Sequence, residues 1–280
     1  MKLKAYAKVN LCLNVVGKRP DGYHDLQMIM APIDLYDTIE MTFDVQTSIQ
    51  ANRAYLPSDE RNTIIKTINK LRERYGFKDQ FRIKLTKNIP SQAGLGGGSA
   101  DAAIMIKTLN RLLDLRMTIP EMLDFGKLIG ADVPYCLINK SSLVQGIGDD
   151  ITAFDYHCPF YLLLVKPKRG VSTKRAFEQL NLLQLTHPDA RAVQACLMAN
   201  DYPGLLSRMG NDLQSSAALF VPEIELLITD LKKFGFDQAL MSGSGSTVFG
   251  ITQDENLVNR AISVFQRRYP FVKKTKIIDI

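Results

Sequence analysis

Apolar and polar side chains alternate along the start of the chain. Every odd position from 3 to 15 is apolar, whereas Lys4, Lys8 and Asn10 occupy even positions. Successive side chains of a strand point to opposite faces of its sheet, so this pattern predicts a half-buried strand over 3–15. Lys8 and Asn10 should therefore lie together on the polar face of that strand.

Helical periodicity marks two segments of the first half. Apolar residues over 61–75 share one helical face, and the run ends at Gly76. A second helical run over 120–129 ends at Gly130. Glycine commonly follows the last turn of a helix, so both segments are predicted to be helices with these endpoints.

The second half combines strand-like and helical runs in a recognisable order. The strand-like runs are 160–165, 239–241, 247–251 and 272–278, and the helical runs include 221–234 and 255–267. If the additional helices are ignored, the order is β-α-β-β-α-β, which is typical of a ferredoxin-like domain. We therefore expect an α+β fold of two domains, divided in the polar segment 148–158.

Glycines crowd the stretch between a strand-like run at 81–87 and a helical run at 99–113. They are Gly94, Gly96, Gly97 and Gly98. A backbone without side chains lets an anion approach closely, and the unpaired N–H groups of a helix start can bind it. The arrangement predicts a phosphate cradle. The simpler alternative is a flexible turn that only caps the helix.

The glycine loop differs from the commoner nucleotide-binding motifs. A P-loop ends in Gly-Lys-Ser/Thr, but Gly98 is followed by Ser99 and Ala100. A dinucleotide fingerprint needs a glycine where Ser99 stands. Its ribose-binding acid should also end a second strand, but Asp114, the acid at about the right spacing, follows a helix with no strand. No His-Arg-Asp or Asp-Phe-Gly motif of protein kinases follows.

Composition and charge narrow the classes of partner. The chain has 280 residues, of which 46% are apolar, and a net charge of +6. Its basic residues are spread along the sequence, so we expect phosphorylated small molecules as ligands and neither nucleic acid nor a membrane. The dispersed cysteines form no metal-ligand pair, which favours reduced thiols and a cytoplasmic location. They are Cys12, Cys136, Cys158 and Cys196.

Several segments together resemble the GHMP small-molecule kinases. They are Ala7-Lys-Val-Asn-Leu11, Asp21-Gly-Tyr-His24, the glycine loop after Pro90, Gly130-Ala-Asp-Val-Pro134 and Met241-Ser-Gly-Ser-Gly-Ser246. The resemblance covers nearly the whole chain. It implies an ATP-binding N-terminal domain like ribosomal protein S5 over 1–155, a ferredoxin-like C-terminal domain over 156–280, and a site in the cleft between them.

The second and fourth of these segments point to a narrower group of GHMP kinases. Its members use ATP to phosphorylate the 2-hydroxyl of a methylerythritol carried on cytidine diphosphate, in non-mevalonate isoprenoid biosynthesis. The resemblance therefore implies ATP with Mg²⁺, and a cytidyl diphosphate alcohol as the small-molecule substrate. A homodimer is left open.

The resemblance assigns the ATP contacts to the glycine loop and two flanking positions. They are Pro90, Gly94, Leu95, Gly96, Gly97, Gly98, Ser99, Lys87 and Asn62. Mg²⁺ would arrive with ATP near Ser99 and would have no dedicated ligands. The alternatives are a plain N-cap for Ser99, a strand-end lysine for Lys87 and a helix-start asparagine for Asn62.

Phosphoryl transfer to an alcohol needs a carboxylate near the hydroxyl and positive charge beside the transferring group. The resemblance assigns these catalytic roles to Asp132 and Lys8. From the residues alone, Lys8 is compatible with a solvated lysine on a polar strand face. Asp132, two residues before a proline, is equally compatible with a turn-former.

The resemblance also implies a set of acceptor contacts. They are Asn10, Tyr23, His24, Phe177, Gly243, Ser244 and Gly245. Tyr23 and Phe177 would stack on the cytosine, with His24 bonded to its edge, as proteins hold unpaired bases. From the residues alone, Tyr23 is compatible with an aromatic packed in a turn, His24 with a capping residue and Phe177 with a helix core residue. Residues 243–245 are compatible with a plain hairpin. His157 and His187 are taken as structural.

The chain departs from the family pattern beside the predicted base. Ile138-Asn-Lys-Ser-Ser-Leu143 stands where the family has a small, glycine-rich or alanine-rich strand, Tyr6 replaces a proline and Ser246 a proline or alanine. The acceptor's identity is therefore open. A GHMP kinase for another alcohol, a nucleotide-binding paralogue without turnover and, least favoured, a nucleic-acid binder are the alternatives.

Overall fold

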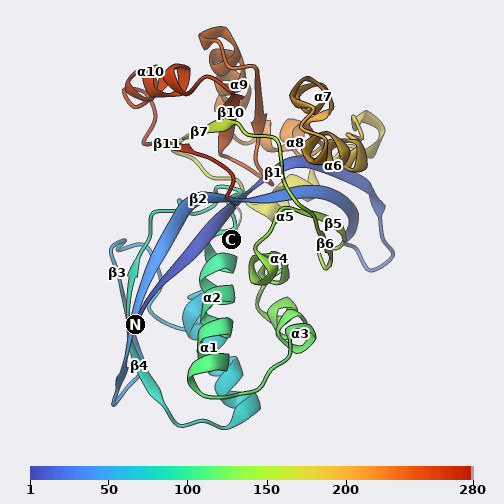
Figure 1. The fold of residues 1–280 in the computed structure, drawn as a ribbon. Helices are drawn as coiled ribbons and strands as arrows, with labels where there is room; N and C mark the ends of the chain where they lie inside the picture. The colour runs from blue at the N-terminus through green and yellow to red at the C-terminus, as the bar shows by residue number, and fades with distance from the viewer. Residues whose placement is uncertain (279–280) are drawn as a thin grey trace. The chain divides into compact units, whose positions relative to one another are not determined.

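The computed structural model describes residues 1–278 (Figure 1). Its described residues form two compact units, and each unit contains segments that are far apart in the sequence. Unit 1 contains 1–7, 35–89 and 96–139, and unit 2 contains 8–34, 90–95 and the chain from 140 onward. The long strands β1 (Lys2–Lys18) and β2 (His24–Asp44) contribute residues to both units.

Unit 1 combines paired strands with four helices. The end of β2 pairs antiparallel with β4 (Gln80–Thr86), which pairs parallel with β3 (Ser48–Ala51). The helices are α1 (Thr63–Tyr75), α2 (Gly97–Leu112), α3 (Ile119–Ile129) and α4 (Val133–Ile138). Helix α2 packs against α1, α3 and α4 (Figure 1). This packing positions the starts of α2 and α4 within unit 1. Both starts contain residues of the predicted site.

Unit 2 contains a four-stranded antiparallel sheet in the order β11-β7-β10-β9. The strands are β7 (Tyr161–Lys166), β9 (Gln238–Met241), β10 (Val248–Thr252) and β11 (Phe271–Thr275), and α9 (Glu223–Phe234) and α10 (Glu255–Phe265) pack on them. In chain order the strands lie 4-1-3-2, so the β-α-β-β-α-β prediction is confirmed.

Further strands and short helices complete unit 2. The start of β2 pairs with β5 (Ser142–Gly146), β5 pairs with β6 (Asp150–Ala153), and β1 pairs with β8 (Gly210–Asn211). The helices are α5 (Thr173–Glu178), the 3₁₀ turn η1 (Leu182–Gln184), α6 (Ala190–Met198), α7 (Tyr202–Arg208) and α8 (Gln214–Ala218).

The first strand is buried more completely than its alternation predicts. Residues 7–13 of β1 are buried at both odd and even positions, so the prediction of a half-buried strand is wrong for this stretch. Elements distant in sequence cover the face that carries Lys8 and Asn10. The solvated-lysine alternative for Lys8 fails for the same reason, since its side chain is only 4% exposed.

Several element boundaries also differ from the prediction by one to three residues. Helix α2 begins at Gly97, two residues before the predicted start at Ser99. The last strand ends at Thr275 rather than Ile278, although Ile277 forms an isolated bridge with Ile33. Within residues 1–278, no helix is long and apolar enough to cross a membrane.

Candidate active site

The glycine loop ends in an uncapped helix start. Gly96 takes the N-cap position of α2 in the left-handed conformation, with φ 69°, and no side chain caps the helix. The N–H groups of Gly97, Gly98 and Ser99 consequently have no partner within the helix, whereas Ala100 N–H donates to Gly96 O. Exposed amides at the positive end of a helix are suited to phosphate. Because Ser99 lies inside α2, the plain N-cap alternative for it is wrong.

Within unit 2, the first part of the glycine loop packs against the second glycine turn. The Ser242 hydroxyl donates to Gly94 O at 3.0 Å and accepts from the Asn10 N–H at 3.2 Å. A Cβ built on Gly94 would lie 1.9 Å from Ser242 O, and one on Gly243 would lie 2.9 Å from Gly94 O. Glycine is therefore required at both turns by close backbone approach.

Lys8 and Asn10 are buried beside these turns. Lys8 Nζ donates to Asn10 Oδ1 at 2.6 Å, and a Cβ on Gly243 would lie 3.1 Å from that ammonium nitrogen. The Lys8 N–H donates to Leu95 O at 3.1 Å. Asn10 is 1% exposed and also donates from Nδ2 to Met28 Sδ. The structure thus brings together the predicted residues Lys8, Asn10, Gly94 and Gly243.

Asn211 holds the second glycine turn, a role that no local sequence pattern predicts. Its Nδ2 donates to Met241 O at 2.7 Å and to Gly243 O at 2.8 Å. The Ser244 hydroxyl lies 2.7 Å from the Thr173 hydroxyl. The alternative of a free-standing hairpin for 243–245 does not describe this turn, because it is anchored from several sides.

Lys87, predicted to contact ATP, lies in a buried charge network of unit 1. Its ammonium pairs with Asp37, and with Asp101 at 2.7 Å. The other Asp37 oxygen accepts the N–H groups of Asn88 and Ile89 at 2.6 and 2.9 Å. A Cβ built on Gly97 would lie 3.2 Å from Lys87 Nζ, so this network supports the first residue of α2.

Burial sets the charge state of this network. It disfavours the Lys87 ammonium, but Asp101 and Asp37 together outweigh that effect and raise its pKa. Burial also raises the pKa of Asp101 to about 7, despite the ammonium beside it. One Asp101 oxygen, Oδ1, is buried without a hydrogen-bond partner, which explains why the carboxylate form is disfavoured.

The raised pKa of Asp101 predicts a pH-dependent stability. Its value of about 7 lies above the ordinary one near 4, so folding takes up a proton between these values. The free energy of unfolding should therefore fall as pH rises from about 5 to about 7. In urea unfolding, Asp101→Asn should make the free energy of unfolding depend less steeply on pH, by up to the contribution of about one proton. An identical slope in the variant and the original protein would contradict the assignment.

Asp132 begins helix α4 without capping it. Its backbone O accepts the Cys136 N–H, but its half-buried side chain makes no capping hydrogen bond. A role as a turn-former therefore accounts for the backbone conformation of Asp132 but does not require its carboxylate. A Cβ built on the nearby Gly130 would lie 3.8 Å from the Ser99 hydroxyl, so the starts of α2 and α4 lie close together in unit 1.

The acceptor aromatics belong to unit 2. His24 begins β2 and stacks on Phe177 of α5, with ring centroids 5.1 Å apart and planes at 25°. Tyr23 is 64% exposed. Partial burial, and secondarily Lys18, lowers the pKa of His24, which favours a neutral ring able to both donate and accept. The exposure of the Tyr23 ring contradicts the packed-turn alternative, whereas the role of His24 stays a prediction.

Asn62 has a structural role that accounts for its position. Its side-chain oxygen accepts the Ile64 N–H at 3.0 Å at the start of α1, and its Nδ2 donates to Pro57 O at 2.9 Å. Both ends of the amide are thus engaged within the chain, as the helix-start alternative requires. Contact with ATP stays a prediction for Asn62. Among residues 1–278, no cluster of His, Cys, Asp and Glu could hold a metal.

Gly94→Ala should destabilise the protein by about 2 kcal/mol or more. The reason is the approach of its Cβ to Ser242 O and a φ of +71°, which side chains rarely adopt. Urea unfolding measures the change. Gly98→Ala is the matched control, because its Cβ would meet only ordinary contacts, 3.5 Å from Thr63. Equal losses in the two variants would contradict the assigned cause.

Comparison with known proteins identifies two family domains in the chain. Residues 62–140 match the family model for the GHMP kinases N terminal domain, and 190–270 match that for the GHMP kinases C terminal. The two matches lie on either side of residue 155, where the domain boundary stays a prediction.

Relatives and solved structures cover nearly the whole chain. The chain is 41% identical to a 4-diphosphocytidyl-2-C-methyl-D-erythritol kinase of Bacillus velezensis, over 92% of this chain and 90% of that protein. It is 39% identical to the kinase of that name from Lachnoclostridium phytofermentans, over 98% and 95%. The crystal structure of a 4-(cytidine 5'-diphospho)-2C-methyl-D-erythritol kinase superposes with a TM-score of 0.84 at 27% identity, covering 100% of both chains. The chain therefore belongs to the GHMP kinase family, and it has the two-domain α+β fold of these kinases.

Proposed function

We propose that this kinase transfers the γ-phosphoryl group of ATP to the 2-hydroxyl of 4-diphosphocytidyl-2-C-methyl-D-erythritol, a step of non-mevalonate isoprenoid biosynthesis. The observation that carries the proposal is the start of α2, which opens with glycines and has no side-chain cap. It occurs in a chain that aligns over about nine-tenths of its length with relatives named as that kinase. Amides at 97–99 supply the phosphate contacts that such a transfer requires.

ATP and Mg²⁺ fit the donor set at the start of α2. Backbone N–H groups of Gly97, Gly98 and Ser99 would bind phosphate oxygens, and the left-handed Gly94 and Gly96 keep side chains away from them. Mg²⁺ would enter with ATP and neutralise phosphate charge. The Ser99 hydroxyl is a hard oxygen at the start of α2 that could bind the ion there. Lys87 would act by supporting Gly97, since its ammonium is already paired with two carboxylates.

Asp132 and Lys8 are proposed to act on the reacting groups. The Asp132 carboxylate would orient the acceptor hydroxyl and accept its proton. The Lys8 ammonium, positioned by Asn10, would stabilise the negative charge of the transferring group. Because Lys8 is buried, its charge is poorly screened by water and has a larger effect than that of a surface lysine.

Aromatic residues are proposed to select the cytidyl part of the acceptor. The exposed Tyr23 ring would stack on the cytosine, and His24, held against Phe177, would bond the edge of the base. The backbone N–H groups of Gly243 and Ser244 would bind the diphosphate, whereas the Gly245 N–H donates to Ser242 O and shapes the turn.

Release of ADP across a panel of alcohols tests the proposal. With ATP and Mg²⁺ present, the cytidyl alcohol should give far faster ADP release than homoserine, mevalonate or phosphomevalonate. Faster release with another alcohol would favour a GHMP kinase with a different acceptor. ATP binding without ADP release from any of them would favour a paralogue without turnover.

Tyr23→Ala should raise KM for the cytidyl alcohol by roughly 10-fold or more, the usual loss when a stacking aromatic is removed. KM for ATP should change little, because Tyr23 is not placed in the ATP contacts. Steady-state kinetics with each substrate varied in turn separates the two values. The exposed Tyr55 is the matched control and should leave both KM values unchanged when replaced by alanine.

Several expectations stay predictions at this point. A homodimer, a cytoplasmic location and the absence of nucleic-acid and membrane partners are among them. So are the proposed domain limits, 1–155 for the ATP-binding domain and 156–280 for the ferredoxin-like domain.

A further inference from the structure

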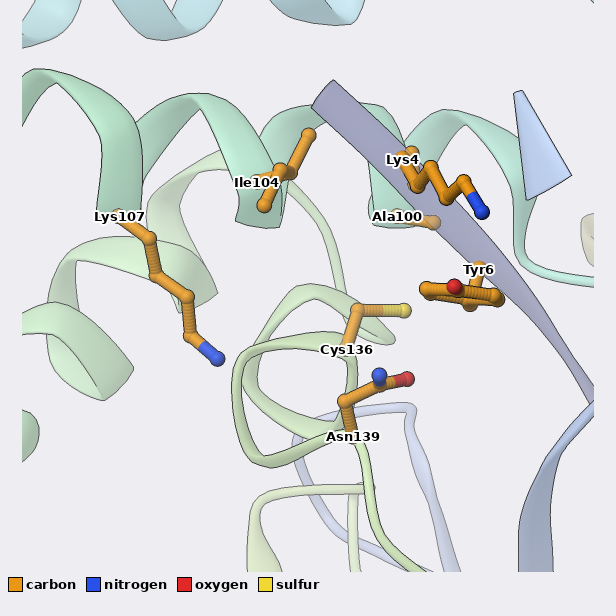
Figure 2. Close-up of a pocket in the computed structure, with 8 residues that line it drawn as sticks. Lys4, Tyr6, Ala100, Ile104, Lys107, Cys136 and Asn139 are labelled. Carbon is orange, nitrogen blue, oxygen red and sulfur yellow. The ribbon is translucent and has the colours of Figure 1, made fainter. Parts of the chain in front are cut away.

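Unit 1 contains a small cavity between the start of β1, the middle of α2 and the end of α4 (Figure 2). Tyr6, Cys136 and Asn139 are among the residues that line it. Its volume of about 40 Å³ has room for a few water molecules but not for a phosphate ester. Donors that are better suited to an anion lie in unit 2, at the second glycine turn, 243–245.

Two backbone N–H groups of the second glycine turn have no acceptor among the described residues. They belong to Gly243 and Ser244, whereas the Gly245 N–H donates to Ser242 O at 3.0 Å. The Lys8 ammonium lies beside the turn, 3.1 Å from the position that a Cβ on Gly243 would take. Two donors and a cation at one turn suit the phosphate groups of a ligand.

The direction of each of these N–H groups follows from the carbonyl of the same peptide group. In a trans peptide the N–H and the C=O point in opposite directions, so holding one of them fixes the other. Ser242 O is held by the Gly245 N–H, which directs the Gly243 N–H. Gly243 O is held at 2.8 Å by Asn211 Nδ2, which directs the Ser244 N–H. The direction of the Ser244 donor therefore depends on the Asn211 side chain.

The Asn211 side chain is itself held in one orientation. One Nδ2 proton is donated to Met241 O at 2.7 Å and the other to Gly243 O, and Oδ1 accepts the Leu213 N–H at 2.9 Å. Asn211 is 7% exposed and belongs to β8, which pairs with β1. Because both amide protons and the amide oxygen are engaged, a rotation of this side chain would break three hydrogen bonds.

We propose that Asn211 is a positioning residue of the kinase reaction, which aims the Ser244 N–H at the diphosphate of the acceptor. This role rests on the acceptor proposed above, because that ligand supplies the diphosphate. The diphosphate is attached at position 4 of the methylerythritol, whereas the reacting hydroxyl is at position 2. Loss of the contact should therefore weaken the ground state and the transition state alike, which raises KM for the acceptor and leaves kcat nearly unchanged.

Calorimetric titration with CDP and with cytidine separates this role from a general loss of structure. Both ligands contain the base, but only CDP contains the diphosphate. The full-length protein is first saturated with a non-hydrolysable ATP analogue, so that the cradle is occupied. Asn211→Ala should weaken CDP binding by roughly 10-fold or more, the usual loss of a hydrogen bond to a charged group. Cytidine binding should change little.

Steady-state kinetics should show the same contrast. Asn211→Ala should raise KM for the cytidyl alcohol by a similar factor, with kcat and KM for ATP nearly unchanged. Asn110→Ala is the matched control, because the Asn110 amide also bonds a backbone N–H and a backbone O, those of Met117, at 2.8 and 3.0 Å. Asn110 lies near the end of α2 in unit 1, so this variant should lose stability without a change in either KM. Thermal unfolding confirms that each variant folds.

Amide NMR of the original protein tests the contact without a substitution. The Ser244 signal should shift strongly with CDP and little with cytidine. An unshifted Ser244 signal, an unchanged CDP affinity in Asn211→Ala, or equal losses for CDP and cytidine would overturn the role of Asn211 alone. If the original protein released no ADP with the cytidyl alcohol, the proposed function would fail, and the role of Asn211 would fail with it.

Discussion

Asp132→Asn is expected to lower kcat by roughly 10²–10⁴-fold, the usual contribution of a general base. Asparagine has nearly the same shape but cannot accept the hydroxyl proton. Helix α4 should form normally in the variant, because the Asp132 side chain makes no capping hydrogen bond there. Steady-state kinetics gives kcat, and equilibrium titration with an ATP analogue should give an unchanged Kd.

A neighbouring carboxylate provides the control for this variant. Asp124 lies on α3, where its exposed side chain pairs with Lys127. Asp124→Asn should therefore retain full activity. If Asp132→Asn kept the original kcat, the carboxylate would have no part in the chemical step. If it lost ATP affinity as well as kcat, its role would be in nucleotide binding instead.

Lys87→Met should lower the free energy of unfolding by about 3–5 kcal/mol at pH 8, the cost of removing one partner from a buried ion pair. The substitution leaves Asp37 and Asp101 buried with no counter-charge, although methionine fills much of the same volume. Because carboxylates can be protonated, the loss should become smaller as pH falls to 5. Urea unfolding at the two pH values measures both effects.

Lys84 supplies the matched control on β4, which ends one residue before Lys87. It is exposed on β4, three residues before Lys87, so Lys84→Met should change the free energy of unfolding by less than about 0.5 kcal/mol. Similar losses in Lys84→Met and Lys87→Met would remove the buried network as the cause. A loss in Lys87→Met that is the same at both pH values would show that the carboxylates do not carry the penalty.

Local pattern was sufficient to predict most elements of the fold. The helix ending at Gly76 and the strand-helix order of the second half depend on periodicities of 3.6 and 2 within short windows. The sequence predicts the start of α2 two residues late because Ser99 resembles an N-cap, whereas the left-handed Gly96 takes that position. The capping preference of serine was outweighed by the geometry of the glycine loop.

Burial and charge pairing could not be predicted from windows of that length. Both faces of β1 are covered, and the alternation of β1 does not indicate what covers its polar face. Asp37 lies 50 residues before its partner Lys87, and neither position has a local pattern that indicates a buried ion pair. Asn211 is likewise remote from the turn that it holds. The roles of Asp132 and Lys8 came from the family resemblance rather than from their surroundings in the sequence.

Phosphorus NMR of a reaction with ATP, Mg²⁺ and 4-diphosphocytidyl-2-C-methyl-D-erythritol identifies which hydroxyl receives the phosphoryl group. We expect a new phosphomonoester signal that grows in proportion to ADP and couples to no proton, because C2 of the acceptor carries the methyl group and no hydrogen. Asp132→Asn should give almost none of this signal in the same time. ADP formed together with inorganic phosphate alone, or a phosphomonoester on a hydrogen-bearing carbon, would contradict the proposed reaction.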